Sequence, residues 1–206
     1  MTMRRLGVML ALCTGVAVLS FVYAQNASSQ SGGQLTTQDY IEIQQLTAGY
    51  PYKIDKCTNS GYDYADQYTE DATFGVSSEW GTPGKIWFRG REELAKAGGG
   101  GKGGCKSMWT TPVPGRVVTH HIVTSQYITP TATGASGKST LMALGVHGDP
   151  TAIEWQGGYE DTYVKTPKGW KFKSRLHCWP GHDWPNTAAE QAALMARPEQ
   201  TPAKKP

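Results

Sequence analysis

The sequence has little excess charge of either sign. Its 206 residues include 20 Lys and Arg against 17 Asp and Glu, a formal net charge of +3. Two of the cations, Arg4 and Arg5, lie in a segment that we expect to be removed, which would leave a net charge near +1. A protein that binds the phosphate backbone of nucleic acids needs a much more basic surface. We therefore exclude nucleic acid as a partner.

Cysteine is scarce, with four residues in the whole chain. Three of them, Cys57, Cys105 and Cys178, follow the expected leader, so one disulfide bond can form and one thiol remains. All three pairings are open. A bond from Cys105 would restrain a glycine-rich segment that has much conformational entropy to lose, so we favour Cys57–Cys105. No residue pattern around these cysteines indicates a reactive thiolate, which argues against a catalytic cysteine.

Phosphate-binding and metal-binding motifs are also missing. The glycine run 98–104 lacks the Gly and the Ser or Thr that a phosphate-binding loop requires around its Gly-Lys pair, so we interpret it as a flexible surface loop or lid. His120 and His121 are neighbours on an expected strand and must point to opposite faces. A weak Cys/His pattern near the C-terminus does not indicate a metal site: His177, Cys178 and His182. We expect no metal and no organic cofactor.

The N-terminus has the composition of a secretory signal. Arg4 and Arg5 precede an apolar stretch, and small residues end at Ala24. We expect cleavage there and an exported protein, periplasmic or secreted, with no membrane attachment. An uncleaved membrane anchor is the alternative, because the apolar stretch is about long enough to span a bilayer. The predicted boundaries are a signal peptide at 1–24, a spacer at 25–35, one domain at 36–180, and a C-terminal helix with a disordered tail at 181–206.

Helix signals dominate the first part of the domain. A helix is predicted to begin near Thr36 or Thr37, whose hydroxyls suit an N-cap, and Pro51 is expected to kink it. Shorter helices are expected around 62–68 and from 90 onwards. A capping box at Thr187 and Glu190 predicts a last helix to about residue 197.

Strand signals dominate the second part. The expected strands are 72–76, 85–88, 116–129, 139–147, 151–165 and 169–178, with turns at 130–138 and 166–169. Helices first and antiparallel strands after them predict an α+β domain, in which one curved antiparallel sheet wraps against the N-terminal helices.

Three side chains could carry acid–base chemistry together. Tyr50 and Asp55 are five residues apart, and Pro51 between them could turn both towards a common space. His121 shares a strand face with Tyr127, in an apolar wall that suits a small hydrophobic substrate. A neighbouring Asp55 would fix the imidazole tautomer, and Tyr50 would donate to an oxygen that gains negative charge. The alternative is that Asp55 is solvated at a helix end and Tyr50 belongs to the core.

The strand at 151–165 offers further candidates. Trp155, Tyr159 and Asp161 share one of its faces by alternation. If that face is internal, Trp155 and Tyr159 line the pocket and Asp161 is a second acid. The alternative for Asp161 is an ordinary ion pair at a strand end.

Four motifs in order resemble the SnoaL-like branch of the nuclear transport factor 2-like superfamily. They are Tyr-x-x-x-x-Asp at 50–55 before YTEDATF at 68–74, GREEL at 90–94, VTHHIVT at 118–124, and GYEDTYVKT at 158–166 leading into GWKF at 169–172. The likeness extends from about 35 to 179. It implies a cone-shaped, strongly curved sheet closed by helices around a pocket, and commonly a homodimer through the outer face of the sheet.

The resemblance also implies a site and a class of reaction. Scytalone-dehydratase-like and bile-acid-dehydratase-like members hold a His–Asp dyad and tyrosines in the pocket, and by motif Asp55, His121 and Tyr50 take these places. His147 is a loose match to a second polar residue on the next strand. We therefore expect a cofactor-independent dehydratase or isomerase that removes a proton alpha to a carbonyl of a small hydrophobic substrate. A non-catalytic periplasmic small-molecule-binding protein and a mainly structural dimer are the alternatives, because this fold hosts many activities.

Overall fold

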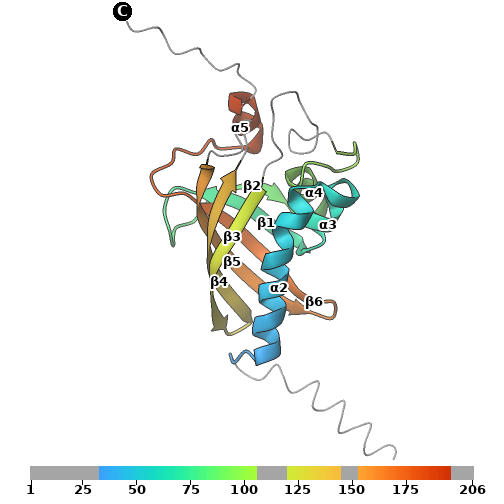
Figure 1. Ribbon diagram of the computed structural model, residues 1–206, viewed down its shortest axis with the longest axis vertical. Helices are drawn as coiled ribbons and strands as arrows, with labels where there is room; N and C mark the ends of the chain where they lie inside the picture. Colours follow the sequence, from blue (N-terminus) through green and yellow to red (C-terminus); the bar gives the residue numbers. More distant parts are fainter. Residues whose placement is uncertain (1–32, 106–119, 145–152, 196–206) are drawn as a thin grey trace, which may run out of the picture.

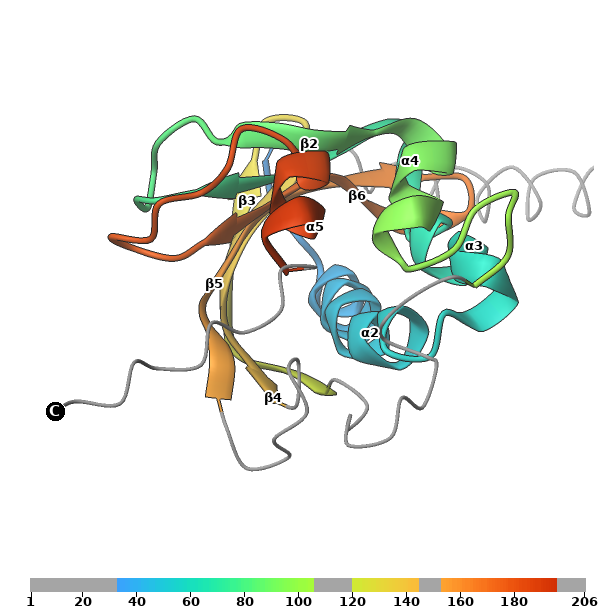
Figure 2. The same cartoon turned by 90° about the horizontal axis from the view of Figure 1, so that it is seen from above.

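The computed structural model describes residues 33–105, 120–144 and 153–195, which form one curved sheet with helices on its inner side (Figures 1 and 2). The predicted signal peptide at 1–24, His147 and the predicted tail beyond 195 lie outside the described residues. Among the helices described, none is both long enough and apolar enough to cross a membrane.

The long helix α2 (Thr37–Ile54) begins where the sequence predicts. The Thr36 hydroxyl accepts the backbone N–H of Asp39 at 3.2 Å, and the Asp39 carboxylate accepts the backbone N–H of Thr36 at 2.9 Å. This capping box satisfies two backbone donors that a helix start otherwise leaves unpaired. The helix continues through Pro51 to Ile54, so the proline does not end it.

Shorter helices flank the sheet, and most match the predicted positions. They are η2 (Thr58–Gly61), α3 (Tyr62–Ala65), α4 (Gly90–Ala97) and α5 (Ala188–Met195). The predicted capping box of α5 is present, because the backbone N–H of Glu190 donates to the Thr187 hydroxyl and its carboxylate accepts the N–H of Thr187, both at 3.2 Å.

The glycine run is fastened to the helical end of the molecule. The backbone N–H of Gly101 donates to the Ser60 carbonyl at 2.8 Å, and a Cβ on Gly100 would lie only 1.8 Å from that carbonyl oxygen. The disulfide bond Cys57–Cys105 forms, as the sequence favoured. Glycine is needed at position 100 because it lets two backbones approach closely, and the flexible loop or lid stays a prediction.

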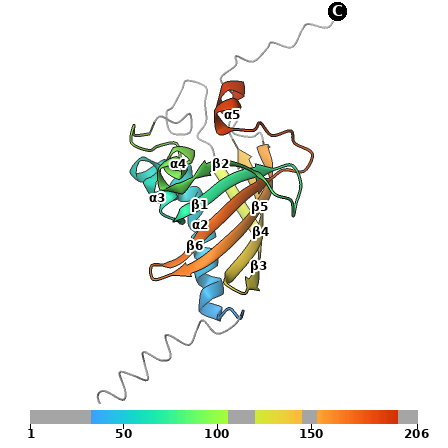
Figure 3. The same cartoon turned by 180° about the vertical axis from the view of Figure 1, so that it is seen from behind.

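The sheet has six strands in the order β2-β1-β6-β5-β4-β3 (Figure 3). Their bounds are β1 (Tyr68–Ser77), β2 (Lys85–Arg89), β3 (His120–Thr131), β4 (Gly134–Leu144), β5 (Ile153–Thr166) and β6 (Gly169–Cys178). Strands β3 and β4 pair as far as Thr131 and Gly134, so the predicted turn at 130–138 shrinks to two residues.

One pair of strands departs from the predicted antiparallel sheet. Strands β1 and β6 are parallel, whereas every other neighbouring pair is antiparallel. The reason is topological: the hairpin β1–β2 and the four-strand meander β3–β6 are separate antiparallel units. They join through the first strand of one and the last strand of the other, which run in the same direction.

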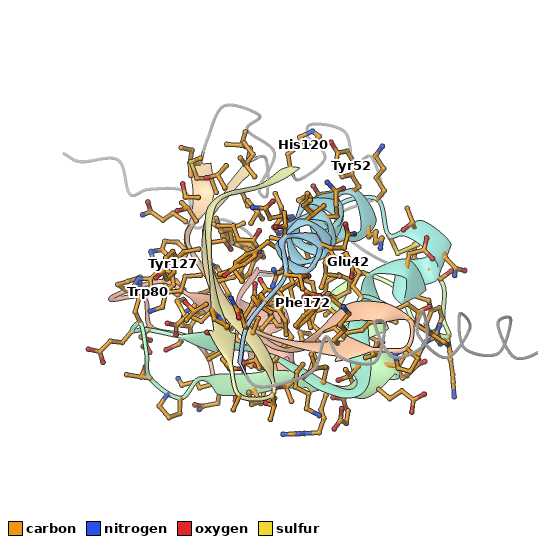
Figure 4. All side chains as sticks on the ribbon, turned by 90° about the horizontal axis from the view of Figure 1, so that it is seen from below. Glu42, Tyr52, Trp80, His120, Tyr127 and Phe172 are labelled. Carbon is orange, nitrogen blue, oxygen red and sulfur yellow. A yellow bond between two sulfur atoms is a disulfide. The ribbon has the colours of Figure 1, made fainter. Side chains whose placement is uncertain are left out.

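An irregularity in β3 turns Tyr127 away from the core. Between Thr124 and Tyr127, β3 contains one residue more than its partner β4, and Ser125 takes a left-handed conformation with φ of 53°. Such a bulge reverses the alternation of faces beyond it. Tyr127 is 69% exposed and lies on the outer side of the sheet (Figure 4), so the prediction that it lines the pocket is wrong.

The core lies between α2 and the inner face of the sheet, and aromatic side chains fill much of it. Figure 2 shows the sheet curving around α2, with β6 on one side of the helix and β4 on another. The buried aromatic members are Tyr50, Tyr64, Tyr68, Tyr159, Tyr163, Trp170 and Phe172. Several carry hydroxyls, so this core needs internal hydrogen-bond partners as well as close packing.

Candidate active site

The structure brings His121 and Asp55 into direct contact. The Asp55 Oδ1 atom lies 2.5 Å from His121 Nδ1, and Oδ2 accepts the backbone N–H of the same residue at 3.0 Å. Both residues are buried. Because one carboxylate holds both the ring and the main chain, the imidazole is oriented with Nδ1 towards Asp55 and Nε2 on the opposite side. His120, the adjacent residue, is exposed, as alternation along a strand predicts.

Tyr50 and Asp55 reach His121 from the last turns of α2. Asp55 is the C-cap residue of that helix, and its backbone N–H donates to the Pro51 carbonyl at 3.0 Å. The ring of Tyr50 meets the imidazole edge to face, with centroids 5.7 Å apart. Strand β3 runs beside this end of α2 (Figure 1), which is why two side chains that diverge along the helix both contact His121.

Two pairs of buried tyrosines are joined through their hydroxyls, and Tyr50 of the first pair packs against His121. Tyr50 and Tyr159 share a hydrogen bond of 2.8 Å between their hydroxyls, and Tyr64 and Tyr68 share another of 2.8 Å. Burial raises the pKa of Tyr50 to about 12 and that of Tyr159 well above its usual range. Each phenol therefore keeps its proton at neutral pH. The Tyr50–Tyr159 pair uses one of its two hydroxyl protons internally, and the other can be donated to a ligand.

Asp161 forms a buried ion pair beneath these rings. Its carboxylate accepts two hydrogen bonds from Arg175, both at 2.8 Å, and a third from the Tyr163 hydroxyl at 2.9 Å. The Arg175 guanidinium carbon lies 4.3 Å from the ring centroid of Tyr50 and 4.2 Å from that of Tyr159. The prediction that Asp161 acts as a second acid facing the ligand is therefore wrong, because all its contacts point into the core.

The sequence pattern of β6 does not indicate that Arg175 is buried, because the register shifts within this strand. Strand β6 has one residue more than β5 between Phe172 and Ser174, so Phe172 and Arg175 both face inwards. Strict alternation from Phe172 would place Arg175 on the outer face. Its charge is tolerated at full burial because Asp161 neutralises it and aromatic faces surround it.

His121 lies in the wall of a small cavity of about 90 Å³, and Asp55 contacts His121 without lining the cavity itself. Its walls are mainly apolar and aromatic, as a hydrophobic ligand requires. Of the predicted residues, Tyr50, His121, Trp155 and Tyr159 line it. The sequence did not indicate the other lining residues in the described part of the chain, which are Ile54, Tyr64, Phe74, Val76, Trp87, Ala97, His177 and Trp184.

His177 is a second imidazole in the same wall. Its Nε2 lies 3.2 Å from the Gln156 carbonyl oxygen, which can only accept, so Nε2 carries the proton and Nδ1 carries the lone pair. Burial lowers the pKa of His177 to about 4, so the ring is neutral at physiological pH. The sequence suggested only a weak metal pattern here. Within the described residues, no three His, Cys, Asp or Glu side chains lie close enough together to hold a metal ion.

The fold and the site define an α+β protein in which one six-stranded curved sheet encloses an apolar pocket, and His121 in the pocket wall is held by Asp55. The chain belongs to the SnoaL-like domain family, which matches residues 36–176. No curated protein matches it.

Solved structures agree with this fold. A protein of unknown function with a cystatin-like fold from Nostoc punctiforme is 20% identical, covers 70% of this chain and 93% of its own, and has a TM-score of 0.51. A putative aromatic ring hydroxylase from Novosphingobium aromaticivorans is 22% identical, with coverage of 71% and 92% and a TM-score of 0.50. A protein of unknown function from Mycobacterium tuberculosis is 21% identical, with coverage of 66% and 69% and a TM-score of 0.50. These likenesses establish the fold alone.

Proposed function

We propose that this protein is a cofactor-independent dehydratase or isomerase that removes a proton alpha to a carbonyl of a small hydrophobic substrate. The observation that carries the proposal is that His121, which lines an apolar cavity, is held by Asp55 at its Nδ1 atom. A general base must be held within reach of the substrate and kept in one tautomer, and the carboxylate at Nδ1 supports both requirements. The surrounding aromatic walls would bind the hydrophobic part of the substrate.

The chemical steps are assigned to three residues that line the cavity, His121, Tyr50 and Tyr159. His121 would take the alpha proton at Nε2, and Asp55 would stabilise the imidazolium that forms. The hydroxyl proton that the Tyr50–Tyr159 pair does not use internally would be donated to the carbonyl oxygen of the enolate. In a dehydration, the enolate electron pair forms the C=C bond as the β-hydroxyl leaves, and the proton on His121 passes to that hydroxyl to give water. In an isomerisation, the same proton returns to a different carbon.

Export and dimerisation are also part of the proposal. The charged start and apolar stretch of residues 1–24 support export, and the Cys57–Cys105 bond is of the kind that persists outside the reducing cytosol. Large apolar side chains that are exposed on β3 and β5 support a homodimer through the outer face of the sheet: Ile122, Tyr127 and Ile153. Sedimentation analysis of wild type against Tyr127→Lys tests the dimer, which the lysine is expected to weaken.

The catalytic proposal is tested with simple substrates. The probe for dehydration is 4-hydroxybutan-2-one, and that for isomerisation is the acyclic ketone pent-4-en-2-one, since both yield a conjugated enone that absorbs in the ultraviolet. His121→Gln is expected to lower the rate by about 10²- to 10⁴-fold, which is the usual contribution of a general base. His120→Gln, on the exposed neighbour, is the matched control and should retain the rate. Equal rates in wild type and His121→Gln would contradict the proposal. Binding that depends on His121 without turnover would favour the non-catalytic binding protein.

A further inference from the structure

Part of the cavity wall comes from chain that follows the family match. The family match ends at residue 176, whereas Trp184 lines the cavity and is only 4% exposed. Beyond β6 the chain passes along the β1–β2 end of the sheet before it enters α5 (Figure 2). One wall of the pocket therefore comes from a segment that is not part of the shared domain.

Trp184 is held in place by both its ring and its backbone. Its indole Nε1 donates to the Ser77 carbonyl at 3.0 Å, and its carbonyl accepts the Lys85 ammonium. The next residue is anchored too, because the Trp87 indole donates to the Pro185 carbonyl at 3.2 Å. The indole of Trp184 is therefore positioned by β1 and β2 and does not simply rest on the surface.

The position of this indole limits the space beside the two histidines. Its ring centroid lies 5.0 Å from that of His177, on the side of the cavity that the segment covers. The cavity that remains, about 90 Å³, is smaller than the roughly 150 Å³ in which a buried apolar cavity holds benzene. Trp87 and Trp155 also line the cavity, but both belong to strands whose backbones are fixed in the sheet.

We propose that Trp184 is the specificity-determining residue of this pocket and that it restricts the ligand to short acyclic carbonyl compounds. Replacing the indole with a small side chain would open the space that a ring-bearing ligand needs. This inference rests on the proposed function for the chemical class of the ligand, but it concerns ligand size and can be measured by binding without turnover.

The test compares two β-hydroxy ketones that differ by a ring. Isothermal titration calorimetry would measure the binding of 4-hydroxybutan-2-one and 3-hydroxy-1-phenylpropan-1-one to the full chain. Wild type is expected to prefer the acyclic ketone by about tenfold or more, and Trp184→Ala to prefer the phenyl ketone by a similar factor. Trp80→Ala, a change of the same kind at a partly exposed loop position, is the control and should keep the wild-type preference.

A second variant protects the test against misfolding. Trp184→Phe retains an aromatic ring of smaller size and is expected to shift the preference towards the phenyl ketone by about threefold. An unchanged preference in folded Trp184→Ala, or in Trp184→Phe if the alanine variant does not fold, overturns the inference. Reversed preference without turnover of either ketone supports this inference and counts against the proposed function. Turnover of a ketone with an unchanged preference supports the proposed function and overturns the role of Trp184. If neither ketone binds to any variant, both the proposed function and the role of Trp184 are overturned.

Discussion

Replacing His177 with glutamine is expected to flatten the pH dependence of stability between pH 7 and pH 5. Burial lowers the pKa of His177 to about 4, whereas an imidazole in the unfolded chain titrates near 6.5. In that interval the unfolded chain binds a proton that the folded chain does not. The free energy of unfolding of the wild type therefore falls as the pH falls, and below the folded pKa the loss is complete.

The size of the effect follows from the two pKa values. Their separation is 6.5 − 4 = 2.5 units, which corresponds to about 3 kcal/mol when the titration is complete. Integration from pH 7 to pH 5 gives about 2 kcal/mol of that total, because the unfolded imidazole is then almost fully protonated. For a domain of this size, 2 kcal/mol lowers the Tm by about 4–8 °C.

Urea unfolding followed by tryptophan fluorescence at pH 7, 6 and 5 measures this loss. Glutamine retains an N–H donor that can serve the Gln156 carbonyl, so the variant removes the titration with the least change in hydrogen bonding. Burial also lowers the pKa of His182, and His182→Gln measures its share. Exposed His120 provides the control His120→Gln. If His177→Gln loses as much stability as the wild type between pH 7 and pH 5, the assignment of a buried, neutral His177 is refuted.

Three further predictions concern the elements that hold the site. Reduction of Cys57–Cys105, which are 48 residues apart, should lower the free energy of unfolding by about 4 kcal/mol through the entropy of the unfolded chain; an unchanged urea midpoint with reductant would contradict this. Tyr50→Phe should lower kcat by about 10- to 100-fold with little change in KM, because the hydroxyl is proposed to act on the enolate; a rise in KM alone would assign it to ground-state binding. Arg175→Met should lower the free energy of unfolding by about 3–5 kcal/mol because it leaves Asp161 buried without its cation. In thermal unfolding, the double variant Arg175→Met with Asp161→Leu should recover part of that loss. A double variant that is less stable than the single one would show that the unpaired charge is not the cause.

Local sequence signals predict where two helices begin, the family of the domain and two central residues of the candidate site. The caps at Thr36 and at Thr187 start helices where their side-chain oxygens meet backbone donors, and both helices begin there. The ordered motifs identify the family and point to Asp55 and His121, whose contact the structure contains. The sequence leaves three cysteine pairings open and favours Cys57–Cys105, which the structure contains.

The tertiary structure alone decides two features: which face of the sheet each strand residue points to, and which distant segment contributes Trp184 to the cavity wall. Extra residues in β3 and β6 reverse the alternation, so Tyr127 faces outwards and Arg175 inwards. A bulge depends on which residues the partner strand offers, and a strand's own sequence does not contain that information. Trp184 reaches the cavity through contacts with β1 and β2, about 100 residues earlier in the chain. Pairing across such separations is settled by the packing of the whole domain, which no local pattern specifies.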